Sequence, residues 1–126
     1  MRAAGLPREA RLRRAADFAA MRQGSGRLGG RCFSVRYRPN GLDQARLGLA
    51  ISKRVSKRAV ERNRIKRLLR ESFRRARREL PPLDLLVTAR ESAVERTGAE
   101  LLAEIDALWR KLPSLKRDDG PATMAS

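Results

Sequence analysis

Two short segments of the chain alternate between apolar and polar positions, as half-buried β-strands do. In RCFSVRYR, residues 31–38, the alternation places Phe33, Val35 and Tyr37 on one side. In RLGLAIS, residues 46–52, large apolar residues alternate with small ones. The connection PNGLDQA between them has the composition of a turn, so the pattern predicts that the two strands pair as a hairpin.

A helical period replaces the alternation after the second strand. The helix is expected to run from about Ser56 to about Glu79, because Pro81 and Pro82 follow it. One face is apolar and is expected to pack: Ile65, Leu68, Leu69, Ser72, Phe73, Ala76 and Leu80. The opposite face is polar and basic and is expected to stay exposed: Asn63, Lys66, Arg67, Arg70, Arg74 and Arg77.

Shorter signals predict the elements that follow. DLLVTA, residues 84–89, is a third apolar strand. Thr97 and Glu100 have the spacing of a capping box and predict the start of a second long helix, which Pro113 is expected to end. The buried stripe of that helix would consist of Leu101, Leu102, Ile105, Leu108, Trp109 and Leu112.

The N-terminal part of the chain precedes these elements. Residues 1–11 have the composition of an extended arm, and a short helix is predicted from about Arg14 to Arg22, with Phe18 and Met21 on one side. QGSGRLGG follows this helix and lacks the strand before and the helix after that a phosphate-binding glycine loop requires. A flexible connection is therefore the better interpretation.

The length of 126 residues allows one domain with one modest core. We expect this domain to cover residues 1–113, including the arm, and residues 114–126 to form a flexible tail. The chain has 30 Lys and Arg against 14 Asp and Glu, a formal net charge of +16. Such an imbalance indicates a polyanionic partner, and nucleic acid is the most common one.

Several other classes of protein are disfavoured by composition. The single cysteine, Cys32, excludes an intramolecular disulfide, and a chain without histidine cannot assemble the usual zinc sites. No apolar run approaches the length of a membrane span or forms the apolar region of a signal peptide. We therefore expect a cytoplasmic protein without a membrane partner.

The strands predict a sheet with two different faces. Helices must cover the apolar face, whereas the other face carries small, polar and basic residues, among them Ser34, Arg36, Ala50 and Ser52. A single-stranded nucleic acid could lie on such a face, with its bases against a nearby aromatic ring. An ordinary solvated sheet face explains the same pattern equally well, and the sequence pattern leaves both interpretations open.

The basic helix gives the stronger functional signal. Residues 53–78 hold thirteen Lys and Arg against two acidic residues, Glu61 and Glu71. This density repels itself unless phosphates neutralise it, and an excess of arginine favours bidentate phosphate contacts. A merely solvated helix would mix charges of both signs. The helix therefore predicts a surface that binds nucleic acid, and Asn63 adds hydrogen-bond donors and an acceptor that a groove or a folded RNA surface can use.

The segment ISKRVSKRAVERNRIKRLLRESFR resembles the signature of the protein subunit of bacterial ribonuclease P, in which an Arg-Asn-Arg triplet precedes Ile-Lys-Arg. The resemblance extends in order along the chain through PREARL, RLGLAISKR, LDLLVTAR and ALWRKL. It implies an α+β fold like the second domain of ribosomal protein S5. That fold is a small mixed β-sheet with helices packed on one face and a left-handed β-α-β crossover.

The resemblance also implies a function. Ribonuclease P is an endoribonuclease that removes the 5′ leader from precursor tRNA, and its catalytic RNA subunit performs the hydrolysis with bound Mg²⁺. The protein subunit would bind that RNA and the leader, raise the affinity for precursor tRNA and lower the Mg²⁺ requirement. No catalytic residue is expected in the protein, and the sequence assigns no residue to a metal.

Two sets of site residues follow from the resemblance. Contacts to the catalytic RNA are expected from Arg62, Asn63, Arg64, Lys66, Arg67 and Arg70, extended by Lys53 and Arg54. The cleft for the single-stranded leader is expected to involve Phe18, Arg22, Ser34, Arg36, Ala50 and Ser52. Arg22 stands where a second aromatic residue is common in the family, so stacking would be weaker here and charge would compensate. The alternative is a ribosomal-type or general RNA-binding protein without a catalytic partner.

Overall fold

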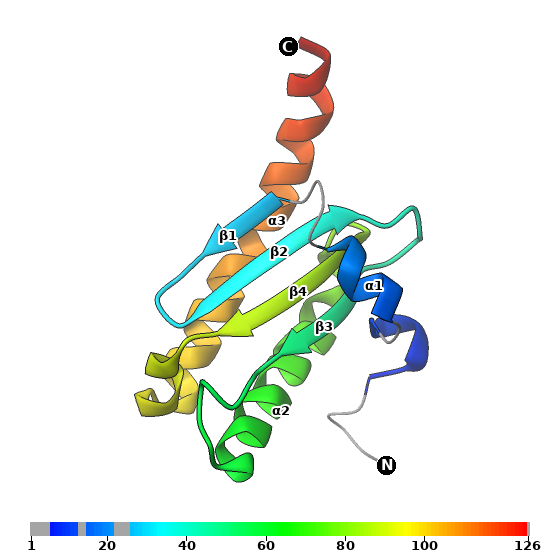
Figure 1. Cartoon of the computed structure of the whole chain (residues 1–126). Helices are drawn as coiled ribbons and strands as arrows, with labels where there is room; N and C mark the ends of the chain where they lie inside the picture. The colour runs from blue at the N-terminus through cyan, green and yellow to red at the C-terminus, as the bar shows by residue number, and fades with distance from the viewer. Residues whose placement is uncertain (1–5, 13–14, 22–25, 126) are drawn as a thin grey trace.

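The computed structural model describes residues 6–12, 15–21 and 26–125 of the chain. The helices are α1 (Ala15–Ala20), α2 (Ala59–Ala76) and α3 (Gly98–Ala125). The strands are β1 (Gly26–Gly29), β2 (Phe33–Pro39), β3 (Arg46–Ala50) and β4 (Leu83–Ala89). The chain forms a four-stranded sheet, and Figure 1 shows the long helices α2 and α3 on one face of it and the short helix α1 on the other. Short 3₁₀ helices cover Arg8–Ala10, Arg77–Glu79 and Glu91–Glu95.

The sheet is mixed and has the strand order β1-β2-β4-β3. β2 runs antiparallel to both β1 and β4, whereas β3 runs parallel to β4. The predicted hairpin between β2 and β3 is therefore wrong, because β4 lies between them. Parallel neighbours need a long crossover connection, and the amphipathic α2 provides it.

The crossover from β3 through α2 to β4 is left-handed. In Figure 1 α2 lies behind the sheet, and the arrows of β3 and β4 both point to the lower left. For an observer who looks along β3 in the direction of its arrow, β4 lies on the right-hand side. This hand is rare among β-α-β units. The mixed α+β architecture and the crossover agree with the fold that the resemblance implies.

β1 corrects the interpretation of QGSGRLGG as a flexible connection, because Gly26–Gly29 pair with Ser34–Tyr37 of β2. A Cβ atom on Gly26 would lie 2.2 Å from Cζ of Tyr37, so the tyrosine ring occupies the space that a side chain would need. Glycine therefore serves close packing against a neighbouring strand here.

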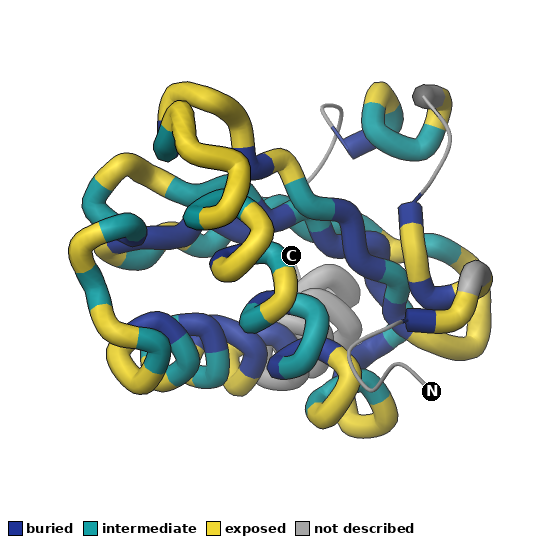
Figure 2. The backbone as a smooth tube through the Cα atoms, turned by 90° about the horizontal axis from the view of Figure 1, so that it is seen from below, coloured by how far each residue is buried: buried dark blue, intermediate teal, exposed yellow. Residues whose placement is uncertain are grey.

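The core lies between the sheet and the two long helices. Phe33 and Val35 of β2 and Leu85 and Val87 of β4 are fully buried on the face that α2 and α3 cover. The helices contribute Ile65, Leu69, Phe73, Leu101, Ile105 and Trp109. Figure 2 shows buried positions along both the strands and the helices. The apolar faces predicted from the helical period and the strand alternation are thereby confirmed.

Ser72 is the polar residue in the buried face of α2, and its hydroxyl joins α2 to α3. Ser72 Oγ donates to Asp106 Oδ1 at 2.6 Å and accepts from Trp109 Nε1 at 2.8 Å. The Trp109 ring also meets Phe73 edge-on, with ring centroids 5.9 Å apart. Because this buried hydroxyl has both a donor and an acceptor partner, its hydrogen bonds compensate for the loss of contact with water.

α3 begins as predicted but continues further. Thr97 Oγ1 accepts from Glu100 N at 3.1 Å and Glu100 Oε1 accepts from Thr97 N at 2.9 Å, which confirms the capping box. The helix continues past Pro113 to Ala125, so the prediction that Pro113 ends it is wrong. Proline inside a helix removes one hydrogen bond and costs about 3 kcal/mol. Leu115, Lys116 and Arg117, which follow Pro113, have high helix propensity and therefore favour continuation of the helix. The interpretation of residues 114–126 as a flexible tail stays a prediction.

The described part of the N-terminal arm is tied to the sheet. Arg11 forms a parallel bridge to Leu47, and Leu12 N donates to Leu47 O at 2.9 Å. The 3₁₀ turn Arg8–Ala10 interrupts the extended conformation that the composition predicted. Residues 1–5 lie outside the described residues.

Candidate nucleic-acid interface

α2 presents its basic face to solvent, with the turn before the helix beside it. Lys53, Arg54, Asn63, Arg64 and Arg67 are exposed, whereas Arg62, Lys66 and Arg70 are partly buried. Ile65 and Leu69 hold the other side of the helix on the core, so the backbone of this surface is fixed. Six of the residues expected to contact the catalytic RNA therefore lie on α2, and Lys53 and Arg54 lie in the turn before it.

The first turn of α2 is organised by Ser56. Its Oγ accepts from Arg58 N at 3.1 Å and donates to Glu61 Oε1 at 2.6 Å. Arg62 Nη1 donates to the Ser56 carbonyl oxygen at 2.9 Å. Arg62 of the Arg-Asn-Arg triplet thus has an internal acceptor, whereas Asn63 and Arg64 point outward.

The two acidic residues of α2 neutralise only its two ends. Glu61 pairs with Arg58 at 3.7 Å, and Glu71 pairs with Arg74 and Arg75 of the next turn. The hydrogen bond from Arg74, supported by the charges of both arginines, lowers the pKa of Glu71 below its ordinary value. Within the described residues, no ion pair reaches the four cations of the middle turns, which are Arg64, Lys66, Arg67 and Arg70.

Phe18 of α1 lies on the sheet face that α2 and α3 leave uncovered. A Cβ atom on Gly48 of β3 would lie 2.9 Å from Cε1 of Phe18 and 2.9 Å from Cδ1 of Leu12. The ring can rest on the strand only because Gly48 has no side chain. Leu12 belongs to the N-terminal segment and was not predicted as a neighbour of this site.

The strand register places the predicted cleft residues on the same face as Phe18. Gly48 pairs with Leu86, which pairs with Arg36, so these residues form one row across the sheet. The next row consists of Ala50, Thr88 and Ser34. Cross-strand partners point to the same side of a sheet, and the structure therefore brings Phe18, Ser34, Arg36 and Ala50 together on one face.

One predicted cleft residue, Ser52, lies beyond the strand that forms this face. β3 ends at Ala50, and Ser52 lies in the turn that follows, where its Oγ accepts from Arg54 N at 3.2 Å. The strand alternation was extended two residues too far, so the assignment of Ser52 to the sheet face is wrong. Arg22 lies outside the described residues.

A groove connects the two predicted surfaces. Its volume is about 180 Å³, and Leu12, Phe18 and Gly48 line it together with Lys66 and Arg70 of α2. Two of the unpaired cations of α2 therefore face the same space as the aromatic ring of α1. The sequence predicted two separate surfaces, and their contact at the edge of β3 is a finding of the structure.

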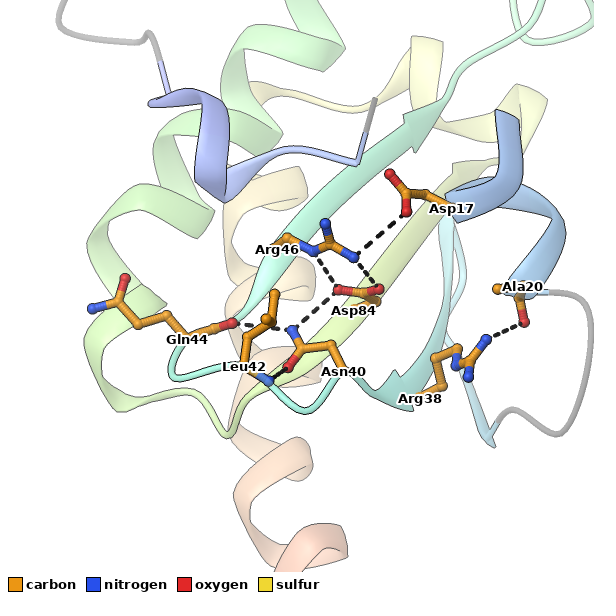
Figure 3. Close-up of polar contacts among 8 residues, drawn as sticks. All are labelled: Asp17, Ala20, Arg38, Asn40, Leu42, Gln44, Arg46 and Asp84. Carbon is orange, nitrogen blue, oxygen red and sulfur yellow. Dashed lines mark hydrogen bonds and ion pairs between the residues drawn. The ribbon is translucent and has the colours of Figure 1, made fainter. Parts of the chain in front are cut away.

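A polar cluster holds α1 against the sheet (Figure 3). Arg46 of β3 binds Asp84 of β4 through Nε–Oδ1 at 2.8 Å and Nη2–Oδ2 at 2.7 Å, and its Nη2 reaches Asp17 Oδ1 at 3.7 Å. The hydrogen bond with Asp84 raises the pKa of Arg46, burial opposes this shift, and the charges of Asp84 and Asp17 support it. Arg38 Nη1 donates to the Ala20 carbonyl oxygen at 3.0 Å. Both arginines thus act as links between the sheet and the helix that carries Phe18.

Sequence reasoning missed this cluster. The only signal was an aspartate, Asp84, at the start of an otherwise apolar strand, where a buried carboxylate requires a partner. Its partner Arg46 is 38 positions away, and only the parallel pairing of β3 with β4 brings the two together.

Side chains that could ligate a metal do not cluster among the described residues. Among them, no three His, Cys, Asp or Glu residues lie close enough to hold a metal ion. Cys32 is buried, and its Sγ lies 3.7 Å from Ser92 Oγ, which is not a general base. No helix in the described part of the chain is both long enough and apolar enough to span a membrane.

A basic crossover helix beside a groove that holds an aromatic ring, on a small mixed sheet, is an arrangement typical of α+β proteins that bind RNA. The family model described as Ribonuclease P matches residues 6–113 of the chain. The chain therefore belongs to the ribonuclease P protein family. Its members are the protein component of the ribonucleoprotein endoribonuclease of tRNA processing, and a general RNA-binding role without a catalytic partner is not favoured.

Individual relatives agree with this membership. The ribonuclease P protein component of Thioalkalivibrio sulfidiphilus is 40% identical over 108 residues, which are 86% of this chain and 90% of the relative. That of Cronobacter sakazakii is 43% identical over 106 residues, 84% of this chain and 89% of the relative. The RNase P protein of Staphylococcus aureus superposes with a TM-score of 0.74 at 28% identity, covering 85% of this chain and 94% of that one. For the Thermotoga maritima protein the TM-score is 0.73 at 29% identity, with 80% and 96% covered.

Proposed function

We propose that α2 binds the catalytic RNA subunit of ribonuclease P, and that the sheet face under α1 binds the single-stranded 5′ leader of precursor tRNA. One observation carries the proposal. Lys66 and Arg70, which belong to the unpaired basic face of α2, line the same groove as Phe18. A strand that leaves the catalytic RNA could therefore pass directly onto the sheet.

The catalytic-RNA surface acts through phosphate contacts. Arg64 and Arg67 are exposed and have no carboxylate partner within the described residues, so an RNA phosphate replaces only water and counterions. Each such contact releases condensed counterions and makes the affinity depend on salt. Asn63 lies between these charges and supplies hydrogen bonds that do not depend on charge. Lys53 and Arg54 extend the surface toward β3.

The leader surface combines stacking with charge. Phe18 offers one ring face, and the small, exposed Ala50 leaves the end of β3 open to a base or a ribose, whereas Phe18 and Leu12 cover Gly48. Stacking on an aromatic ring contributes about 1–3 kcal/mol per base and tolerates any sequence. Arg36 supplies charge two strands away, and Ser34 supplies a hydroxyl beside it.

The chemistry of cleavage belongs to the RNA in this proposal. Mg²⁺ bound to the RNA supplies Lewis-acid and nucleophile-activating chemistry. Asp17 and Asp84, the two carboxylates of the polar cluster that holds α1, both face Arg46 and form a poor magnesium site. The protein side chains add cations that hold RNA phosphates together, so less Mg²⁺ is needed, and they bind the leader, which mature tRNA lacks. We place this activity in the cytoplasm.

The test is cleavage of a 5′-labelled precursor tRNA at low Mg²⁺ by a bacterial ribonuclease P RNA, with and without the protein. We expect accurate release of the leader only when the protein is present. Arg64→Ala should weaken the affinity for the catalytic RNA, whereas Arg110→Ala, the same change at an exposed position of α3, should not. Binding of the RNA without any response in cleavage would refute the proposal.

A further inference from the structure

Two arginines lie directly opposite each other at the β1 end of the uncovered sheet face. The register pairs Arg27 of β1 with Arg36 of β2, so both side chains point to the face on which Phe18 lies. Arg27 Nε donates to Ser34 Oγ at 3.2 Å, which holds the guanidinium over the same face. Like charges directly opposite in an antiparallel pair destabilise the sheet.

No carboxylate compensates this repulsion within the described part of the chain. The ion pairs there involve Asp17, Glu61, Glu71 and Asp84, and none of them includes Arg27 or Arg36. A single phosphate between the two guanidinium groups would neutralise the pair and could accept hydrogen bonds from both.

From this arrangement we infer that Arg27 and Arg36 form a phosphate site, which extends the leader cleft to the outer edge of the sheet. The inference rests on the proposed function. Arg27 lies in the same row as Gly48, three strands away, which is about 14 Å at the usual strand spacing. The site therefore takes a nucleotide other than the one at Phe18.

The position of α2 fixes which end of the leader reaches this site. Lys66 and Arg70 border the groove at Phe18 and belong to the surface proposed for the catalytic RNA. The catalytic RNA holds the cleavage site of the precursor. The leader enters the protein at Phe18, and its nucleotides further from the cleavage site lie toward Arg27. Arg27 thus acts only on precursors whose leaders are long enough to cross the sheet.

The experiment measures the affinity of the reconstituted holoenzyme for precursors whose leaders are shortened from the 5′ end one nucleotide at a time. Arg27→Ala should weaken binding of the long leaders about threefold to tenfold, the effect of one charge-assisted contact at an exposed site, and leave the shortest leaders unaffected. The salt slope for long leaders should fall by about 0.7. Arg27→Lys should keep the slope, and Arg110→Ala, the same loss of charge on α3, should change neither quantity.

Two results would overturn the inference. One is an effect of Arg27→Ala that is equal for all leader lengths or absent. The other is a variant that associates with itself during gel filtration while its leader affinity is unchanged, because Arg27 would then only protect the edge strand from pairing. Phe18→Ala distinguishes the inference from the proposed function. If Phe18→Ala binds all leaders normally, the proposed leader site itself is wrong. If Phe18→Ala weakens leader binding and Arg27→Ala does not, only the role of Arg27 is refuted.

Discussion

The pair of Arg46 and Asp84 offers a direct test of how the sheet holds α1. Asp84 accepts two hydrogen bonds from Arg46 at 2.8 and 2.7 Å and a third from Asn40 Nδ2 at 3.1 Å. Its side chain is 8% exposed and that of Arg46 is 22% exposed. Asp84→Ala therefore removes the main counter-charge of a guanidinium that is largely withdrawn from water.

The expected loss of stability follows from this burial. Removing one partner of a buried ion pair costs about 3–5 kcal/mol. Because Arg46 keeps some contact with water, we expect a loss of about 2–3 kcal/mol for Asp84→Ala and about 1–2 kcal/mol for Asp84→Asn, which keeps the shape of the side chain. Against a total of about 5–15 kcal/mol for a typical domain, this is a large fraction.

The assay is urea unfolding of the variants, with Asp43→Asn as a control that removes a negative charge from an exposed loop position. A double-mutant cycle between Arg46 and Asp84 should give a coupling energy above about 1 kcal/mol. Asp17→Asn should change stability by less than about 1 kcal/mol but weaken leader binding, because the 3.7 Å contact with Arg46 helps to place α1. A loss below about 0.5 kcal/mol for Asp84→Ala would refute the reasoning.

Three further predictions concern α2 and the groove. Arg64→Ala should leave unfolding unchanged but reduce the salt slope of catalytic-RNA binding by about 0.7–0.9, and an unchanged slope would remove Arg64 from the interface. Gly48→Ala should cost about 1–3 kcal/mol and weaken leader binding because the ring of Phe18 must move, whereas Gly98→Ala in α3, whose Cβ would meet Leu68 at an ordinary 3.7 Å, should not affect the leader. The folded-state pKa of Glu71 is lowered, so its contribution is present above its ordinary pKa and is lost as the pH falls through the folded value. Thermal unfolding of Glu71→Gln should accordingly depend less on pH between neutral and acid than that of the unmodified protein, and identical pH profiles would contradict this.

Elements with a strong period were predictable from the sequence. The alternation around Phe33 and Val35 and the helical stripe through Ile65, Leu69 and Phe73 each repeat over enough positions that only one secondary structure buries all the apolar residues. Most of the sheet, the long helices and their buried faces follow from these patterns and agree with the structure.

Elements specified by distant contacts were not predictable in this way. β1 is rich in glycine, and Gly26 is selected by the Tyr37 ring above it rather than by any local period. The parallel pairing of β3 with β4 depends on where α2 packs, which neither strand encodes, and the wrong hairpin followed from that gap. A pattern of buried and exposed positions is also the same for either hand of a crossover. The family resemblance, and not the residue pattern, provided the hand.

The candidate site divides in the same way. The basic face of α2 lies within one helix, so its composition and period were enough to predict it. The groove needs Leu12, Phe18, Gly48 and Lys66 from four different segments, and only the folded chain brings them together.

The structure also shows why net charge alone overstates the number of arginines that are available to the proposed RNA-binding surface. Arg38 and Arg77 donate to backbone carbonyl oxygens, Arg62 donates to the carbonyl of Ser56, and Arg46 is paired with Asp84. Truncating these side chains leaves a carbonyl or a carboxylate without its donor, and the cost appears as lost folding stability. The exposed arginines of the middle of α2 have no such acceptor within the described residues, so their loss should appear as lost affinity for RNA. The internal hydrogen bonds of each arginine therefore predict, before any binding measurement, which substitutions report on the interface and which report on the fold.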